Sequence, residues 1–338
     1  MSDGGPSDLL AVGIDGGGTS TRVLLVDGDG RRLGEGASGS GNLHDVGRER
    51  LTAHVDEAWR AAWAAAGAPP RAADSVFCAM ASVGTPGNRE AVRELVTEVG
   101  VGVPGAVEVD IDLVGALAGG LGGGDGVVLI AGTGSSCFGR DGGGRTFQSG
   151  GWGSLLDDVG SATWLGTGAM IAALRAFDRR GPATCLEERV MEALGLEHMR
   201  ELLPAIDGGV EVRARRASLA RLVTAAAAEG DGVATALLEQ GAEALAECVE
   251  AVWRTLDFGG EPFEVALTGG LGEHAPAYRD LVHGAVQRRV PDARCVRARA
   301  SNLVGAALVA LERAPERALE RGLAAPAGPA RERLLRGE

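Results

Sequence analysis

The chain has 338 residues, 45% of them hydrophobic and 23% charged, which is ordinary globular material and enough for two domains with their own cores. The formal net charge of −13 argues against a nucleic-acid partner, because a phosphate backbone demands a basic surface. All 33 basic residues are arginine. Walker-type P-loops, protein kinases and Schiff-base enzymes each need a lysine, so the sequence excludes these classes.

Cysteine usage and hydropathy indicate the cellular setting. The five cysteines show no CxxC spacing and are odd in number, which favours reduced thiols over a disulfide framework or a zinc site. The first residues are polar, and no apolar run approaches the roughly 18 residues of a membrane span. We therefore expect a cytoplasmic protein with neither a signal peptide nor a membrane partner.

The first expected element is a glycine-containing hairpin at Leu9–Asp27. Its apolar runs, Leu9–Ile14 and Val23–Val26, have the length of buried strands. The consecutive glycines Gly16–Gly18 are costly in a strand and predict a turn whose backbone approaches something closely. Backbone N–H groups in such a turn form an anion site, and Asp15 could hold a cation beside it. The alternative interpretation is a plain glycine-rich hairpin turn.

Strands and helices alternate in the next hundred residues, which predicts an α/β sheet with helices packed on it. Strands are expected at Arg31–Gly36, Ser75–Ala81 and Ala106–Val109, and helices at Gly47–Ala66 and Asn88–Val99. The tryptophans at positions 59 and 63 follow the helical spacing of the first helix and are expected in the core.

The strand Ala106–Val109 closes on Asp110 and Asp112, and Asp112 opens a segment of small and apolar residues. A carboxylate in this position is either a functional group or the N-cap of a short helix, worth about 1 kcal/mol. The sequence alone leaves both interpretations open.

A second glycine turn has the same sequence pattern as the first. The apolar run Val127–Ile130 is followed by the turn Gly132–Ser135 and by a further strand. Two such units suggest a duplicated domain that grips one ligand between its halves.

The remaining chain is mostly helical, with one more glycine turn. A polar, glycine-broken loop from Gln148 precedes a helix that runs from Gly160 through Ala176. Asp157 and Asp158 lie just before this helix, either as partners of its dipole or as ligands for a polyhydroxylated substrate. Helices are expected over 184–256, with breaks near 208–209 and 230–232, then a strand at Pro262–Leu267, the turn at 268–272, and helices at Pro276–Val290 and Leu303–Arg313.

Two surface features are expected in this region. The arginine-rich run at 212–221 is interpreted as a solvated helix face rather than a nucleic-acid patch. Exposed apolar helix faces within 231–256 would suit a homodimer. The tail at 314–338 is rich in Ala, Pro, Arg and Glu and is expected to be partly helical.

Four motifs, taken together and in order, resemble the N-acetylglucosamine kinase family, the branch of the actin-like ATPase superfamily related to the BadF/BadG-type ATPases. GIDGGGTSTRVLLVD (13–27) resembles the first phosphate motif of the family, and VVLIAGTGSSC (127–137) resembles the second. VALTGGLGE (265–273) resembles the adenosine-side motif, and GGWGSLLDDVGSATWLG (150–166) resembles the diagnostic GGWG…GDEGS stretch. The resemblance extends over roughly Leu9–Glu312.

The resemblance implies an α/β fold of two actin-like (ribonuclease H-like) domains, each a five-stranded mixed sheet flanked by helices, with the active site in the interdomain cleft. The implied N-terminal domain is 1–111, and the C-terminal domain, with a helical insertion, is 112–300. Residues 301–338 would form a helix that packs back on the N-terminal domain, followed by a tail.

The family transfers the γ-phosphate of ATP to the 6-hydroxyl of a hexosamine, and the resemblance assigns roles residue by residue. The phosphates would contact Gly16, Gly17, Gly18 and Thr19, and from the second domain Gly132, Thr133, Gly134 and Ser135. Gly269 and Gly270 would lie against the adenosine, and Asn42, Gly151, Trp152 and Asp158 would bind the sugar. Asp15 would hold Mg²⁺ through water, and Asp112 matches the catalytic base.

Two departures from the family pattern concern specificity and structure. The family usually reads GDEGS where this chain has Asp157, Asp158, Val159, Gly160 and Ser161. The charged Asp157 replaces a flexible glycine of the family, and the apolar Val159 replaces a glutamate that accepts hydrogen bonds. Both changes bear on which sugar fits. The second departure is a missing proline pair before the final helix, at Ala300–Leu303.

The alternatives fall into three groups. Glucosamine, N-acetylmuramic acid or a sugar-like cyclitol could replace N-acetylglucosamine as the substrate. An activator ATPase of a reductive dehydratase would need an iron–sulfur cluster held by cysteines in a glycine-rich context, and none of the five cysteines has that setting. A non-catalytic ATP-binding regulator is disfavoured because Asp15 and Asp112 are both present.

Overall fold

The computed structural model describes residues 8–206, 210–320 and 330–337. The chain divides into two compact units, the first within Met1–Gly124 and Ala298–Glu338 and the second within Asp125–Arg297. Unit 1 thus extends past residue 111, where the sequence motifs put the boundary. The physical reason is that helix α3 (Asp112–Leu121) packs against helix α12 (Asn302–Glu320) and strand β4 of unit 1.

Unit 1 is built on a mixed sheet with the strand order β3-β2-β1-β4-β5. Strand β1 pairs antiparallel with β2 and parallel with β4, while β2–β3 is antiparallel and β4–β5 is parallel. The strands are β1 (Leu10–Gly16), β2 (Thr21–Asp27), β3 (Arg32–Ser38), β4 (Ser75–Met80) and β5 (Val107–Ile111).

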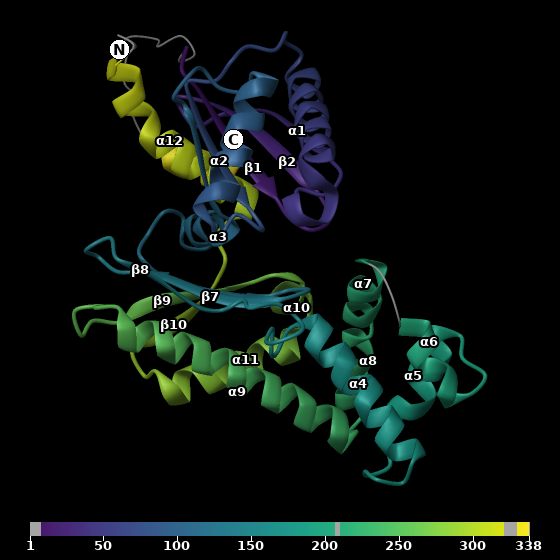
Figure 1. Ribbon diagram of the computed structural model, residues 1–338. Helices are drawn as coiled ribbons and strands as arrows, with labels where there is room; N and C mark the ends of the chain where they lie inside the picture. Colours follow the sequence, from purple (N-terminus) through teal and green to yellow (C-terminus); the bar gives the residue numbers. More distant parts are fainter. Residues whose placement is uncertain (1–7, 207–209, 321–329, 338) are drawn as a thin grey trace. The chain divides into compact units, whose positions relative to one another are not determined.

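Helices cover both faces of the unit 1 sheet, because successive side chains of its buried strands point to opposite sides. Val12 and Ile14 join the core under α1 (Leu43–Ala66) and α2 (Pro86–Val99). The same core buries both tryptophans of α1, as expected. Ala11 faces the opposite core, with α12 and α13 (Ala330–Arg336). Figure 1 shows α12, in yellow, alongside β1. The approach is close enough that a Cβ on Gly13 would lie 2.4 Å from the backbone nitrogen of Ala307.

Unit 2 repeats the arrangement with the strand order β10-β9-β6-β7-β8. Here β6 pairs antiparallel with β7 and parallel with β9, as β1 does with β2 and β4. The strands are β6 (Gly126–Ala131), β7 (Ser135–Arg140), β8 (Thr146–Gly150), β9 (Phe263–Thr268) and β10 (Ala293–Arg297). The expected pair of five-stranded mixed sheets flanked by helices is confirmed for the described residues.

The helices of unit 2 pack with β6, β7 and β9 into one large apolar core. They are α4 (Ala162–Phe177), α5 (Leu186–Leu194), α6 (Leu202–Ile206), α7 (Val210–Ser218), α8 (Ala220–Ala228), α9 (Gly232–Thr255), α10 (Gly270–His274) and α11 (Pro276–Arg289), with a 3₁₀ turn at Met199–Glu201. The expected break at 230–232 is present, whereas the break at 208–209 lies outside the described residues. Figure 1 shows α9 and α11 side by side.

Three expectations from the sequence need correction. Gln148 lies in β8 rather than in a loop, because the segment pairs with β7. Strand β10 was not expected, since two of its five residues are arginines and it is a short parallel edge strand. The apolar face of α9 that would have suited a homodimer is buried inside unit 2, where Leu238, Leu245 and Val249 join the core.

Two further findings concern the setting of the protein. No helix in residues 8–206, 210–320 and 330–337 is long and apolar enough to cross a membrane. All five cysteines lie in the described part of the chain and are free thiols, with Cys78 and Cys137 buried.

Candidate active site

The first glycine turn lies where β1 ends and β2 begins. Its backbone is closed by a hydrogen bond from the Gly17 N–H to the Ser20 carbonyl, 3.0 Å long. A Cβ on Gly17 or Gly18 would meet no heavy atom within 4 Å, and Gly18 and Thr19 are exposed. The backbone of this turn is therefore open to a ligand, as an anion site requires.

Gly16 differs from the two glycines that follow it. A Cβ there would lie 2.4 Å from the sulfur of Met80, so packing of the core explains this glycine. On its other side lies the loop that carries Asn42, because the Gly41 N–H donates to the Gly17 carbonyl at 2.8 Å. The turn and the Asn42 loop are thus one local structure.

A cluster of polar side chains lies at the same edge of the unit 1 sheet. The carboxylate of Asp15, next to last in β1, accepts a 2.6 Å hydrogen bond from Nδ2 of Asn302 at the start of α12. Burial raises the pKa of Asp15 to about 6, against the opposing charge of Arg22, and the nearby Asp112 raises it further. The two carboxylates therefore lie close enough to repel each other.

Asp112 is the first residue of α3 and not its N-cap. Ile111 occupies the N-cap position and makes no side-chain cap bond, so the N-cap interpretation of Asp112 is wrong. Burial raises the pKa of the Asp112 carboxyl, and hydrogen bonds from backbone N–H groups, first that of Leu113, partly oppose the shift. Asp112 is thus a half-buried acid with a raised pKa, placed where β5 ends.

Asn42 has a structural role that the sequence did not predict. It is the N-cap of α1, and its Oδ1 accepts a hydrogen bond from the backbone N–H of His44 at 3.0 Å. The helix therefore begins at Leu43, earlier than Gly47, where the backbone is kinked with φ of 75°. The cap fixes the Asn42 side chain beside the first glycine turn.

The second glycine turn, Gly132–Ser135, is held from behind by the segment that leads into α4. The Ala162 N–H donates to the Gly132 carbonyl at 2.8 Å, and Oγ1 of Thr163 donates to the Thr133 carbonyl at 2.6 Å. Oγ of Ser135 donates to the Val159 carbonyl at 3.0 Å. These bonds fix the backbone of the turn at the N-terminal end of α4.

Asp158 lies directly beside this turn, with only 3% of its surface exposed and a left-handed φ of 58°. Its Oδ1 accepts a 3.4 Å bond from the Ser135 N–H, and its Oδ2 accepts a 3.2 Å bond from Nη2 of Arg213 on α7. Burial raises the pKa of Asp158, while the Ser135 N–H and the Arg213 charge oppose the rise. Arg213 is exposed, as expected for the run at 212–221, and its guanidinium also pairs with Asp158.

The third glycine turn lies against the second, because β6 and β9 are parallel neighbours whose carboxyl ends share one edge. Gly269 has a left-handed φ of 88°, and a Cβ there would lie 2.9 Å from the Gly132 nitrogen. Helix α10 begins at Gly270. Unit 2 thus brings together the residues expected at the phosphates and those expected at the adenosine.

The loop after β8 exposes large apolar side chains. Trp152 is 79% exposed, and Leu155 and Leu156 are 93% and 81% exposed. Gly151 has a φ of 80°, and a Cβ there would lie 2.7 Å from Oγ of Ser136. Gly151 therefore packs on β7, whereas Trp152 projects away from the core of unit 2.

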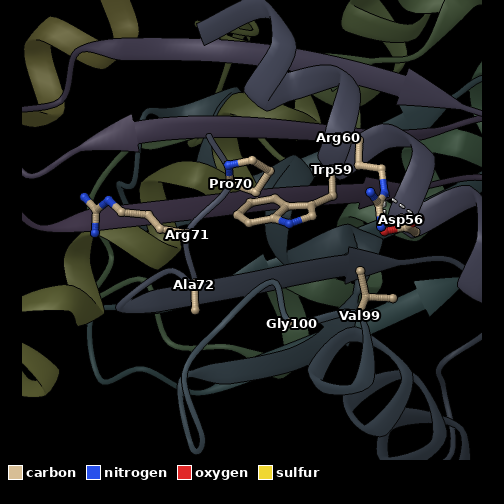
Figure 2. Close-up of a pocket in the computed structure, with 8 residues that line it drawn as sticks. All are labelled: Asp56, Trp59, Arg60, Pro70, Arg71, Ala72, Val99 and Gly100. Carbon is tan, nitrogen blue, oxygen red and sulfur yellow. Dashed lines mark hydrogen bonds and ion pairs between the residues drawn. The ribbon is translucent and has the colours of Figure 1, made fainter. Parts of the chain in front are cut away.

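A pocket of about 180 Å³ in unit 1 lies apart from these residues (Figure 2). Trp59 stands at its centre, and Arg60 is bound to Asp56. The other lining residues include Pro70–Ala72, which precede β4, and Val99–Gly100, which end α2. The glycine turn and Asp15 lie at the opposite, carboxyl end of the parallel strands, where ligands of α/β sheets usually bind.

The donor set fits a magnesium ion only together with a ligand that supplies oxygens. Among the described residues no group of three or more His, Cys, Asp or Glu side chains could hold a metal. Mg²⁺ prefers one or two carboxylates completed by water and substrate phosphates, and Asp15 with Asp112 nearby provides the carboxylates.

Two sheets of one strand order, each with a glycine turn after its first strand, define the two-domain fold shared by sugar kinases and actin-like ATPases. The chain belongs to the BadF/BadG/BcrA/BcrD ATPase family, which matches residues 12–310.

Individual relatives are similar over nearly their whole length. The chain is 28% identical to an N-acetylmuramic acid/N-acetylglucosamine kinase of Clostridium acetobutylicum, over 88% of this chain and 97% of the relative. It is 30% identical to an N-acetyl-D-glucosamine kinase of Dictyostelium discoideum, over 90% of this chain and 98% of the relative. A solved structure of a Chromobacterium violaceum protein, assigned as an N-acetylglucosamine kinase, is 30% identical with a TM-score of 0.72, over 90% of this chain and all of that one.

Proposed function

We propose that the chain is an ATP-dependent kinase that phosphorylates the 6-hydroxyl of an amino sugar, with N-acetylglucosamine as the leading substrate. The observation that carries the proposal is the half-buried pair Asp15 and Asp112, with Asp15 beside the open glycine turn of unit 1 and both carboxyl pKa values raised by burial. The kinase names of relatives that match 88% and 90% of the chain at 28% and 30% identity support it. ATP as co-substrate fits the expected cytoplasmic location.

The residue roles follow the chemistry of phosphoryl transfer, which needs positioning, charge neutralisation and a proton acceptor. Asp112 takes the proton of the attacking 6-hydroxyl as the new P–O bond forms and the bond to the β-phosphate oxygen breaks, with ADP as the leaving group. Asp15 holds Mg²⁺, which supplies positive charge to the phosphate oxygens when bound.

The binding roles are assigned in the same way. The turns Gly16–Thr19 and Gly132–Ser135 receive the phosphates, and Gly269–Gly270 receives the adenosine. Asn42, Gly151, Trp152 and Asp158 bind the sugar. For Asp158 this role is supported by oxygens already oriented by Ser135 and Arg213, since a carboxylate can accept further bonds.

The test is an ADP-release assay with N-acetylglucosamine, glucosamine, N-acetylmuramic acid, neutral hexoses and cyclitols, each with MgATP. N-acetylmuramic acid belongs in the panel because Val159 replaces an acceptor side chain and because one relative carries that sugar in its name. We expect one amino sugar to stimulate ADP release strongly. If none does, the kinase proposal fails.

The catalytic base is tested by Asp112→Asn. General base catalysis contributes roughly 10²- to 10⁴-fold, so we expect kcat to fall by about that factor while sugar binding measured by calorimetry stays near wild type. Asp110→Asn is the matched control, because Asp110 pairs with Arg89 on the protein surface. Substantial turnover by the Asp112 variant would exclude Asp112 as the base.

A further inference from the structure

Arg213 lies against the second glycine turn. Its Nη2 is 2.8 Å from the position that a Cβ on Gly134 would take, and Oδ2 of Asp158 is 2.9 Å from the same point. The guanidinium and the carboxylate therefore meet at the Cα of Gly134. A side chain at this position would displace one of them, which explains the glycine.

The charge of Asp158 poses a problem for a phosphate site. The carboxylate is almost fully buried and hydrogen-bonded to the Ser135 N–H, one of the groups that would face an anion. A negative charge there repels phosphate unless a cation offsets it. Arg213 supplies that cation through its bond to Asp158.

Arg213 has binding capacity beyond this bond. Its side chain is 47% exposed, and one of its five N–H donors is directed to Asp158. A planar guanidinium can bind a carboxylate with one edge and phosphate oxygens with another. The chain has no lysine for this task, so the charge of a bound polyphosphate must be met by arginine, by a metal and by backbone N–H groups.

We propose that Arg213 binds the phosphate oxygens of the nucleotide at the Gly132–Ser135 turn, while it neutralises Asp158. The inference rests on the proposed function, because it takes this turn as a phosphate site. It adds a cation from α7, a helix outside the motifs that carry the family resemblance. It also assigns Asp158 a second task, which is to orient that cation.

The test compares Arg213→Met with Arg215→Met in the full-length protein. Arg215 lies on the same helix but donates to the Ala205 carbonyl, so its loss controls for helix propensity and overall charge. Affinities for ADP and adenosine are measured by calorimetry, and KM values for ATP and sugar by ADP release. We expect Arg213→Met to weaken ADP binding and raise the KM for ATP about tenfold or more, as for loss of a charge-assisted bond. Adenosine affinity should change less than twofold, and Arg215→Met should behave as wild type.

Other outcomes overturn the inference in distinguishable ways. If ADP affinity is unchanged and only the KM for sugar rises, Arg213 serves Asp158 alone and the inference is wrong. If wild type binds no ADP, the proposed function fails with it. Should Arg213→Met not fold, Arg213→Gln carries the test, because Gln can still donate to Asp158 but has no charge. Wild-type ADP affinity in that variant would reject the phosphate contact.

Discussion

The two glycine turns are built alike but their carboxylates have different partners. Each turn follows the first strand of its unit and has an Asp beside it, the half-buried Asp15 in unit 1 and the buried Asp158 in unit 2. The neutral amide of Asn302 donates to Asp15, whereas the cationic Arg213 donates to Asp158. The charge of Arg22 also acts on Asp15, but the guanidinium of Arg22 donates to Glu35, so the two sites differ in the group that holds the carboxylate.

The two units have one strand order but hold their carboxylates in different electrostatic settings. An amide fixes the direction of the Asp15 carboxylate without cancelling its charge, which suits a cation ligand. A guanidinium cancels the charge of Asp158, which suits a neighbouring anion. We therefore expect the first turn to depend on metal and the second to depend on arginine.

The largest expected effect comes from removing one charge at a time. Asp15→Asn should reduce kcat/KM by about 100-fold or more and abolish its dependence on Mg²⁺ concentration, because the carboxylate is the proposed metal ligand. Asp158→Asn should leave ADP affinity within about threefold and raise the KM for sugar. Asn accepts the left-handed backbone of Asp158, so the variant keeps the local conformation. An equal loss of Mg²⁺ dependence in both variants would contradict the expectation that only the first turn depends on metal.

Asn302→Ala should have the next largest effect. Loss of the amide removes a donor that favours the ionised form of Asp15, so the pKa of Asp15 rises further and activity falls more in acid than in base. We expect a reduction of kcat/KM by about tenfold at pH 6.5 and less at pH 8, in line with one hydrogen bond to a charged group. A loss that is independent of pH would indicate a packing defect at the start of α12.

The wild-type pH profile provides a milder test. The folded-state pKa of Asp15 is raised from 3.8 to about 6, so this group is ionised above pH 6 and becomes protonated below it. The raised pKa of Asp112 acts in the same direction, since a base must also be ionised. The kcat/KM for MgATP should therefore fall as the pH drops through about 6. Higher Mg²⁺ concentrations should move this acidic limb of the pH profile to lower pH, because metal and proton would compete for Asp15. A limb that does not respond to Mg²⁺ would contradict the metal role.

The smallest effect is expected at Asn42, where two roles overlap. Asn42→Ala removes the α1 N-cap and should lower the free energy of unfolding by about 1 kcal/mol, measured by urea denaturation. Asn42→Asp keeps the cap and should leave stability nearly unchanged. Both variants should raise the KM for sugar, since both lose the amide N–H donors. A normal KM in Asn42→Asp would remove Asn42 from the sugar site.

The turns were predictable because their signals are local. Glycines that follow an apolar run, with an acidic or hydroxyl residue adjacent, report a strand end and an open backbone within ten residues of sequence. The partners of the two carboxylates carry no such signal. Asn302 is 287 residues from Asp15, and Arg213 is 55 residues from Asp158.

The differences between expectation and structure have similar causes. The arginine-rich run contains Arg213 and Arg215, and only tertiary packing distinguishes the one at the glycine turn from the one at a helix carbonyl. The boundary at 111 followed the motif order, whereas α3 belongs with α12 because glycines let their backbones meet. A Cβ on Gly305 would lie 1.9 Å from the Gly115 carbonyl oxygen. Such contacts between distant segments cannot be read from local periodicity.

The return of α12 to the first sheet has a consequence for biosynthesis. Unit 2 is one continuous stretch, so it is complete on the ribosome before Asn302 has been made. Unit 1 must wait for α12, and until then one face of β1, with Gly13 and Ala11, lacks its cover. The nascent chain therefore exposes an unfinished apolar sheet face, and Asp15 has no amide partner. Asp15 gains its amide partner only once α12 has been made, so the polar site of unit 1 is completed after the synthesis of unit 2.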